Sequence, residues 1–208
     1  MARENIAPTK SSLLRVKEQL NLALEGHDLL DQKREILVHE LLILMKEAKT
    51  LEESLAERVD SAYPTLEKAL MTLGRNEAEK LAGSVVVGYQ YRESSVGKAG
   101  LAFSSIGVDI PASEPRVSLS GGSAAADRTM VEFQELLALT VALATVGTQV
   151  ARLARELKKT QRRVNALEKI VIPQMRETGH YIETVLEERD REAFFVGKLL
   201  KRRYRSGG

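Results

Sequence analysis

Two long stretches of the sequence carry apolar residues at alternating steps of three and four. From Leu13 to Leu55, this stepping meets an apolar residue at eleven of thirteen positions. From Leu136 to Val185 it does so at twelve of fifteen positions, counting one tyrosine as apolar. Such a seven-residue repeat is typical of a left-handed coiled coil, because it keeps one apolar stripe facing a partner helix. The sequence therefore predicts two long amphipathic helices.

The composition changes between these stretches. Eight of the 14 glycines lie between Gly74 and Gly122, and charged residues are sparse there. This contrast predicts three parts: an N-terminal coiled-coil helix over residues 1–73, a Gly-rich insert over 74–126, and a C-terminal coiled-coil helix with a basic tail over 127–208.

The two helical arms are similar in length, which favours an antiparallel hairpin in which each arm buries its seam on the other. Such a pairing would place opposite each other residues whose numbers total about 212, and it would bring the two chain ends together. We expect the second helix to begin near Asp127 as N-cap and to run to about Arg203. The alternative is that each arm pairs with its copy in a homodimer.

Three irregularities interrupt the repeat. After Leu55 the apolar register resumes one residue late at Val59, a stutter that unwinds a coiled coil locally. Pro64 follows and is expected to kink or end the helix. Pro173 lies within the second repeat, where a kink without termination is expected.

The insert is expected to be partly β. Apolar and small residues alternate over Val85–Tyr91, and Leu101–Ile110 and Arg116–Leu119 could add further short strands. Gly97–Gly100 would form the intervening turn. A disordered loop is the alternative. The predicted fold class is thus mainly α: a long antiparallel two-helix coiled coil with a small, Gly-rich, partly β hairpin insert.

The sequence contains no pattern typical of catalysis or of cofactor or metal binding. There is no cysteine, so disulfides, thiolate zinc sites and a catalytic cysteine are excluded. Gly97-Lys98 lacks the spacing of a phosphate-binding loop. His27, His39 and His180 are far apart in the sequence, and no acidic residues cluster with them as a metal site would need. We therefore expect no catalytic residues, cofactor or metal.

Two polar residues fall on the first apolar seam. A polar residue at a seam position more often sets coiled-coil register than binds a ligand, so this is the role expected for His27 and Arg34. An acidic residue near Glu177 or Glu183 on the other arm would pair with Arg34.

Basic residues are concentrated in two places on the second arm. We consider both as partner-binding candidates, against the simpler interpretation that they form a solvated face. The candidates are Arg152, Arg155, Lys158, Lys159, Arg162 and Arg163 in the first band and Lys201, Arg202, Arg203 and Arg205 at the C-terminus.

Charge and hydropathy indicate a soluble protein. The net charge of +2 is too small to indicate bulk nucleic-acid binding. The polar N-terminus predicts no signal peptide. The most apolar run, Leu136–Val146, is too short to span a bilayer.

Several segments are similar to one known family. They are Pro8-Thr9-Lys10 with the Leu13 to Arg34 pattern, Lys158-Lys159-Thr160-Gln161-Arg162-Arg163-Val164-Asn165-Ala166-Leu167-Glu168, Ile172-Pro173, the acidic run Leu186–Glu192, and Phe194-Phe195. These segments resemble those of the D subunit of the V/A-type rotary ATPases, and they follow one another in the same order and at similar distances along the chain. The resemblance covers about two thirds of the chain. The Lys158–Glu168 stretch is the most specific of them.

This resemblance implies a central-stalk rotor shaft in the cytoplasm, peripheral to the cell membrane. In that family a coiled coil enters the bore of a hexamer of catalytic and non-catalytic subunits, and its side is bound by a small F subunit. A socket subunit links it to the membrane ring. The competing hypotheses are a free-standing coiled-coil scaffold, a membrane-remodelling hairpin, or a nucleic-acid-binding homo-oligomer.

Overall fold

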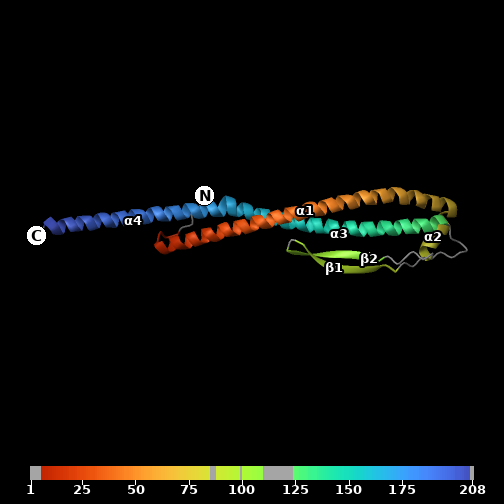
Figure 1. The fold of residues 1–208 in the computed structure, drawn as a ribbon, viewed down its shortest axis with the longest axis horizontal. Helices are drawn as coiled ribbons and strands as arrows, with labels where there is room; N and C mark the ends of the chain where they lie inside the picture. The colour runs from red at the N-terminus through yellow and green to blue at the C-terminus, as the bar shows by residue number, and fades with distance from the viewer. Residues whose placement is uncertain (1–5, 85–87, 99, 110–123, 207–208) are drawn as a thin grey trace. The chain divides into compact units, whose positions relative to one another are not determined.

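The computed structural model describes residues 6–84, 88–98, 100–109 and 124–206 and is mainly α-helical (Figure 1). In chain order its elements are α1 (Lys10–Leu73), α2 (Arg75–Ser84), β1 (Gln90–Lys98), β2 (Leu101–Asp109), α3 (Ala124–Ala166), the π-helical turn η1 (Leu167–Val171) and α4 (Ile172–Ser206). The predicted fold class is confirmed: long N- and C-terminal helices flank a two-stranded antiparallel sheet.

The chain divides into two compact units. Residues 1–35 with 157–208 form one, and residues 36–156 form the other. Both α1 and α3 contribute to each unit, and the contacts described below each lie within a single unit.

The ends of α1 follow from local chemistry. The Thr9 hydroxyl accepts the backbone N–H of Ser12 at 3.1 Å, so Thr9 caps the N-terminus of the helix after Pro8. At the other end Gly74 has a φ of +75° and donates its N–H to the Leu70 carbonyl. Glycine adopts this left-handed conformation without strain, which is why the helix ends there.

The apolar seam predicted for α1 is confirmed by burial. Leu37 and Leu44 have no exposed surface, and Val16 and Ala62 are almost as deeply buried. Every seam position predicted between Leu13 and Leu66, the polar ones included, is at least partly buried. The seven-residue repeat alone therefore identifies the inward face of this helix.

The stutter is also visible in the burial pattern. Val59 and Ala62 turn inward, whereas Arg58, which would continue the earlier register, is exposed. Pro64 lies within α1, which continues to Leu73, so the proline does not end the helix. Beyond it the seam passes through Ala69 rather than the predicted Leu70.

On the second arm the seam follows the prediction as far as η1 and then changes phase. Leu153 and Val164 are buried, as predicted. Beyond η1 the predicted Thr178 is buried too, but so are Ile172 and Ile182, each one residue after a predicted position, and Tyr181 is exposed. The N–H of Ile172 bonds to the carbonyl of Leu167, five residues back. This wider turn directly precedes Pro173, which has no N–H to continue the regular ladder. The extra residue in the turn shifts the inward face by one position.

The start of the second arm also differs slightly from expectation. The helix begins at Ala124, so Asp127 lies in its first turn and is not the N-cap. In the first turn its negative carboxylate still interacts favourably with the positive end of the helix dipole.

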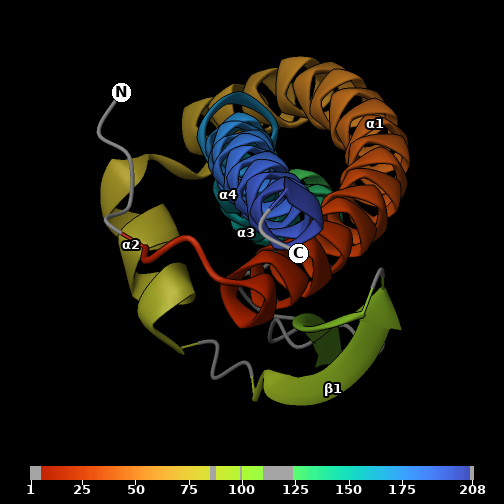
Figure 2. The same cartoon turned by 90° about the vertical axis from the view of Figure 1, so that its left-hand side faces the viewer.

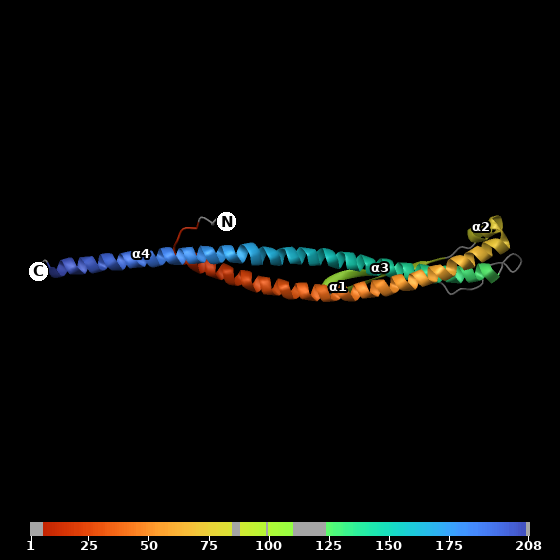
Figure 3. The same cartoon turned by 90° about the horizontal axis from the view of Figure 1, so that it is seen from above.

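The antiparallel pairing is offset from the prediction. Lys17 contacts Glu183 in one unit, and Arg58 contacts Glu135 in the other. The numbers of two facing residues therefore add up to about 193 to 200, and not to the predicted 212. The prediction assumed that the arms are equal in length and end together. Instead, α4 continues well past the start of α1 (Figure 3).

The insert contains one predicted and one unpredicted element. β1 pairs antiparallel with β2 in one-to-one register from Gln90–Asp109 to Lys98–Leu101, which is the expected hairpin, although its first strand lies later than Val85–Tyr91. The strand proposed for Arg116–Leu119 lies outside the described residues. The short helix α2 was not predicted. It has only ten residues and few apolar side chains, most of them small, so its sequence carries a weak periodic signal.

The phase change at η1 can be tested with two isoleucines. Ile182 has no exposed surface, whereas Ile170 is 53% exposed. We expect Ile182→Ala to lower the free energy of unfolding by about 2–5 kcal/mol, through lost burial and a cavity. Ile170→Ala should change it by less than about 0.5 kcal/mol. Urea denaturation of the full chain measures both, and equal losses would contradict the burial assigned to Ile182 beyond η1.

Candidate functional site

The first basic band lies along the last four turns of α3, and its six residues are exposed. Arg152 and Arg155 belong to the unit of residues 36–156, and the other four belong to the unit that contains the chain ends. Arg155 and Arg162 each bond through Nε to the carbonyl four residues back, at 3.2 Å and 3.4 Å. These bonds hold the guanidinium groups along the helix surface.

Arg152 has a structural contact that the sequence did not suggest. Its guanidinium carbon lies 5.7 Å from the ring centroid of Phe103 in β2, and Phe103 is almost fully buried. A cation over an aromatic face within about 6 Å is attracted by the ring quadrupole. Arg152 thus helps to hold the hairpin against α3.

The Lys158–Glu168 stretch has two different faces. Thr160 and Val164 are buried on its inner side, where Gln161 donates from Nε2 to Asn165 Oδ1 at 2.9 Å. Its lysines and arginines are exposed on the outer side. One short segment therefore supplies both helix packing and a cationic surface.

Arg34 faces this stretch from α1. Its Nη1 donates to Gln161 Oε1 at 3.4 Å, and its Nη2 pairs with Asp31 at 2.6 Å. The predicted partner near Glu177 or Glu183 is therefore wrong, because the offset between the arms places Glu183 beside Lys17 instead. The resulting polar network, Asp31–Arg34–Gln161–Asn165, crosses the helix pair within the unit of the chain ends.

His27 is partly buried on the seam, as predicted, and its Nδ1 lies 3.2 Å from the carboxylate of Asp28. Among the residues that the structure describes, no three His, Asp or Glu side chains converge as a metal site would require. The register role of His27 and Arg34 stays a prediction.

The second basic cluster belongs to a helical segment that α1 does not cover. We call residues 187–206 of α4 the C-terminal segment. Every described side chain from Glu187 to Arg203 is exposed, and Arg189 bonds to the carbonyl of Pro8, at the start of the opposite arm. The exposed apolar side chains are Phe194, Phe195, Val196, Leu199 and Leu200. Lys201, Arg202, Arg203 and Arg205 are exposed on the same segment.

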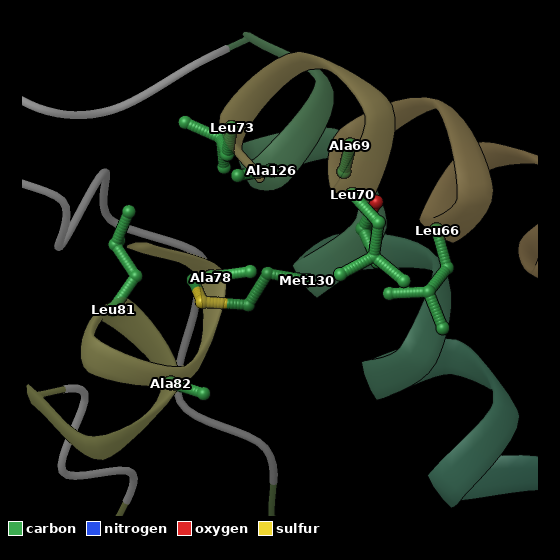
Figure 4. Close-up of a pocket in the computed structure, with 10 residues that line it drawn as sticks. Leu66, Ala69, Leu70, Leu73, Ala78, Leu81, Ala82, Ala126 and Met130 are labelled. Carbon is green, nitrogen blue, oxygen red and sulfur yellow. The ribbon is translucent and has the colours of Figure 1, made fainter. Parts of the chain in front are cut away.

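An apolar cavity of about 300 Å³ lies in the other unit, where the end of α1, α2 and the start of α3 meet (Figure 4). The figure shows Leu70, Leu81 and Met130 at its wall, and Thr129 is its one polar lining residue. Nearby, Glu132 accepts from Arg128 Nε at 3.0 Å. The Thr65 hydroxyl beside Glu132, together with Arg128, holds the pKa of this carboxyl below its ordinary value.

By length and composition alone, the helical stretch Ala124–Arg203 contains a window apolar enough to cross a membrane. This window is longer than the Leu136–Val146 run singled out from the sequence. The signal is weak, because a core helix of a soluble protein meets the same criterion. In this structure 22% of that window is buried, Leu136 and Val146 among the buried residues of the helix.

Sequence reasoning missed the residues that act across the structure. The partners of Arg152 and Arg34 are Phe103 and Gln161, which lie far from them in sequence. The exposed C-terminal apolar residues could have been found, since Phe194 and Phe195 are two of only four phenylalanines. From the sequence they were interpreted only as part of the family pattern.

The role of Arg152 gives a direct prediction. Arg152→Ala removes the cation over Phe103 and should speed hydrogen exchange of the β2 amides several-fold. Arg155→Ala is the matched control, because it removes an exposed arginine of the same band that has no described contact with the hairpin. Exchange mass spectrometry of the full chain measures both. Unchanged β2 exchange in Arg152→Ala would contradict the anchoring role.

The Lys17–Glu183 pair gives a pH prediction. A hydrogen bond from Lys17, at 2.6 Å, and its positive charge lower the pKa of Glu183. A lowered pKa stabilises the folded state above the ordinary glutamate pKa, and this contribution is lost as pH falls through the lowered value. The stability advantage of the wild type over Glu183→Gln should therefore be present at pH 7 and vanish in acid. An advantage that persists unchanged in strong acid, where the carboxylate is protonated, would contradict this assignment.

Comparison with known proteins agrees with this arrangement. The family model for the D subunit of ATP synthase matches residues 12–202. The chain is 45% identical over 198 residues to the D 2 subunit of the V-type ATP synthase of Treponema pallidum, covering 95% of both chains. It is 37% identical to the V-type D subunit of Thermotoga neapolitana, covering 95% of this chain and 97% of that one. For the A-type D subunit of Thermococcus kodakarensis the identity is 35%, with coverage of 95% and 94%. The chain belongs to the family of ATP synthase D subunits.

Proposed function

We propose that this chain is the central-stalk rotor subunit of a V/A-type ATPase or ATP synthase. In this role it transmits torque between ATP turnover in a catalytic hexamer and ion translocation by a membrane ring. The names of its relatives support membership of such a complex. As the shaft, the chain itself is non-catalytic.

The observation that carries the proposal is the C-terminal segment. It is a single helix with exposed phenylalanine and leucine side chains, and no part of α1 covers it. Large apolar side chains on an unpaired helix are favourable only when another surface removes them from water. Insertion into the bore of a hexamer supplies such a surface. The four basic residues at its end would meet acidic or carbonyl-rich walls there.

Torque transmission also requires a shaft that does not slip. The buried seam of α1 resists separation of the helices, but an apolar seam alone tolerates sliding by a whole repeat. The polar network of Arg34, Gln161 and Asn165 opposes such a slip, because moving either helix would leave partly buried polar groups unpaired. This supports a register role for Arg34. His27 lies on the same seam, one seven-residue repeat earlier.

The proposed partners follow from the exposed surfaces. The basic band on α3, from Arg155 to Arg163, suits acidic loops of the hexamer or of the small F subunit. The unit of residues 36–156, with the cavity between α1, α2 and α3, suits the socket subunit that links the shaft to the membrane ring. The chain would then lie in the cytoplasm, peripheral to the membrane.

A pull-down with this chain as bait from its native cell extract tests the function. Recovery of the hexamer subunits and a small stalk subunit is the expected result. Recovery of the chain alone as a homo-oligomer would favour a free-standing scaffold instead. Salt-sensitive recovery of nucleic acid would favour a nucleic-acid binder. Family membership favours neither alternative.

The basic band can be tested by charge reversal. Arg162→Glu with Arg163→Glu should slow ATP turnover of the reconstituted complex several-fold, because like charges would then face acidic loops. The helix should stay folded, since both side chains are exposed. Lys33→Glu with Lys46→Glu on α1 changes the same number of exposed charges as a control. Turnover equal to the control, with normal assembly, would reject a role for this pair.

A further inference from the structure

The described contacts between the hairpin and α3 come from β2. The Thr145 hydroxyl of α3 lies 3.3 Å from the carbonyl oxygen of Ile106 in β2, and Phe103 of β2 is buried under Arg152. In contrast, every residue of β1 from Gln90 to Gly97 is exposed. Figure 1 draws β2 nearer to α3 than β1, and Figure 2 shows the hairpin outside the helices. One edge of the sheet is thus covered, and the other is open.

The register determines which peptide groups point out from the open edge. In an antiparallel pair, hydrogen-bonded and non-hydrogen-bonded residue pairs alternate. The carbonyl of Ile106 is directed at α3, so the Glu93–Ile106 pair is a non-hydrogen-bonded one. Lys98 pairs with Leu101, and two residues separate them in the sequence, so this pair is a hydrogen-bonded one. Counting back from it along β1 gives the same alternation. The N–H and C=O groups of Tyr91, Glu93 and Ser95 therefore point away from β2.

This edge lacks most of the features that protect an exposed strand against pairing. Such strands are commonly blocked by proline, by a bulge, by short length or by charged side chains, and of these β1 has only the charged side chains, among them Arg92 and Glu93. β1 has nine residues, contains no proline and pairs one-to-one with β2 without a bulge. A two-stranded sheet is also marginal by itself, and a third strand would stabilise it.

The side chains on the outer face indicate what would pair there. Tyr91 is 75% exposed and Ile106 is 48% exposed. Pairing places both on the face opposite Phe103, with Glu93 between them. Arg92, on the other face, is neutralised by its bond to Asp109. The unpaired charge on the outer face is thus acidic, beside two apolar side chains.

We propose that β1 receives an extended segment of another subunit of the same complex, which adds a third strand to the hairpin. The segment would bond to the outward peptide groups of Tyr91, Glu93 and Ser95. It would place an apolar side chain opposite Tyr91 and a lysine or arginine opposite Glu93. This inference rests on the proposed function, since the partner is a subunit of that complex.

A second copy of this chain is a poorer occupant of the same edge. Two β1 strands that paired antiparallel about their midpoints would bring Glu93 close to Glu93 of the copy. Like charges at neighbouring positions across a sheet are destabilising. The charge therefore favours a different, basic strand.

Hydrogen exchange resolved to single amides tests this inference, comparing the free full-length chain with the ATPase complex purified from the native cell. The amides of Tyr91, Glu93 and Ser95 should exchange at least tenfold more slowly in the complex. The amides of Arg92, Ser94 and Val96 already bond to β2 and should change little. Slowing of neither set, or equal slowing of both, would overturn strand addition; equal slowing would indicate a covering surface.

Two variants make the test specific. Ser95→Pro removes one outward N–H without removing a bond to β2, whereas Ser95→Thr keeps that N–H and is the matched control. In the complex, Ser95→Pro should abolish the slowing at Tyr91 and Glu93, and Ser95→Thr should preserve it. Faster exchange at Arg92 and Ser94 would show that the proline disrupts the hairpin. In that case Glu93→Lys is the variant to use, and it should reduce the slowing at Tyr91 and Ser95. Full slowing in Glu93→Lys would overturn the proposal.

The outcomes separate this inference from the proposed function. If the chain does not co-purify with ATPase subunits, the function itself fails. If it co-purifies and the outward amides stay unprotected, only the strand addition fails. Protection that appears in the free chain as its concentration rises would identify a second copy as the occupant and overturn the proposed partner.

Discussion

The packing of one apolar seam against another is the interaction on which the rest of this structure depends. Neither long arm can bury its stripe alone, and the buried positions on α1 recur as the seven-residue repeat requires, from Val16 to Ala62. The other helix faces carry charged side chains together with exposed apolar ones, such as Leu22, Leu29 and Ile36. Those faces, rather than a pocket within the seam, are what the chain offers to partners.

Departures from the regular repeat give this helix pair its individual features. The π-helical turn before Pro173 moves the inward face by one residue, so that Ile182 rather than Tyr181 is buried. The offset between the arms leaves the end of α4 without cover from α1. The phenylalanines and basic residues there are exposed because of this length difference, which the composition of the segment does not reveal.

Prediction from sequence succeeded where the signal is periodic and local. The seam, the stutter and the hairpin each depend on spacing within a single segment, and each is present. It failed for contacts between segments. Arg34 was expected to meet an acidic residue and instead meets Gln161, and Arg152 was considered only as an exposed charge, although it lies over Phe103.

The sequence by itself therefore determined the helical arms, their inward faces as far as η1 and, through the Lys158–Glu168 stretch, the family. A repeat of seven specifies which side of a helix is buried, because side-chain direction follows helix geometry. The repeat does not specify where along the partner each residue lies, since sliding by seven residues buries a similar stripe. Only the tertiary structure gives that offset, which places Arg34 beside Gln161 and Lys17 beside Glu183. It thereby decided which residues of α4 remain free to bind.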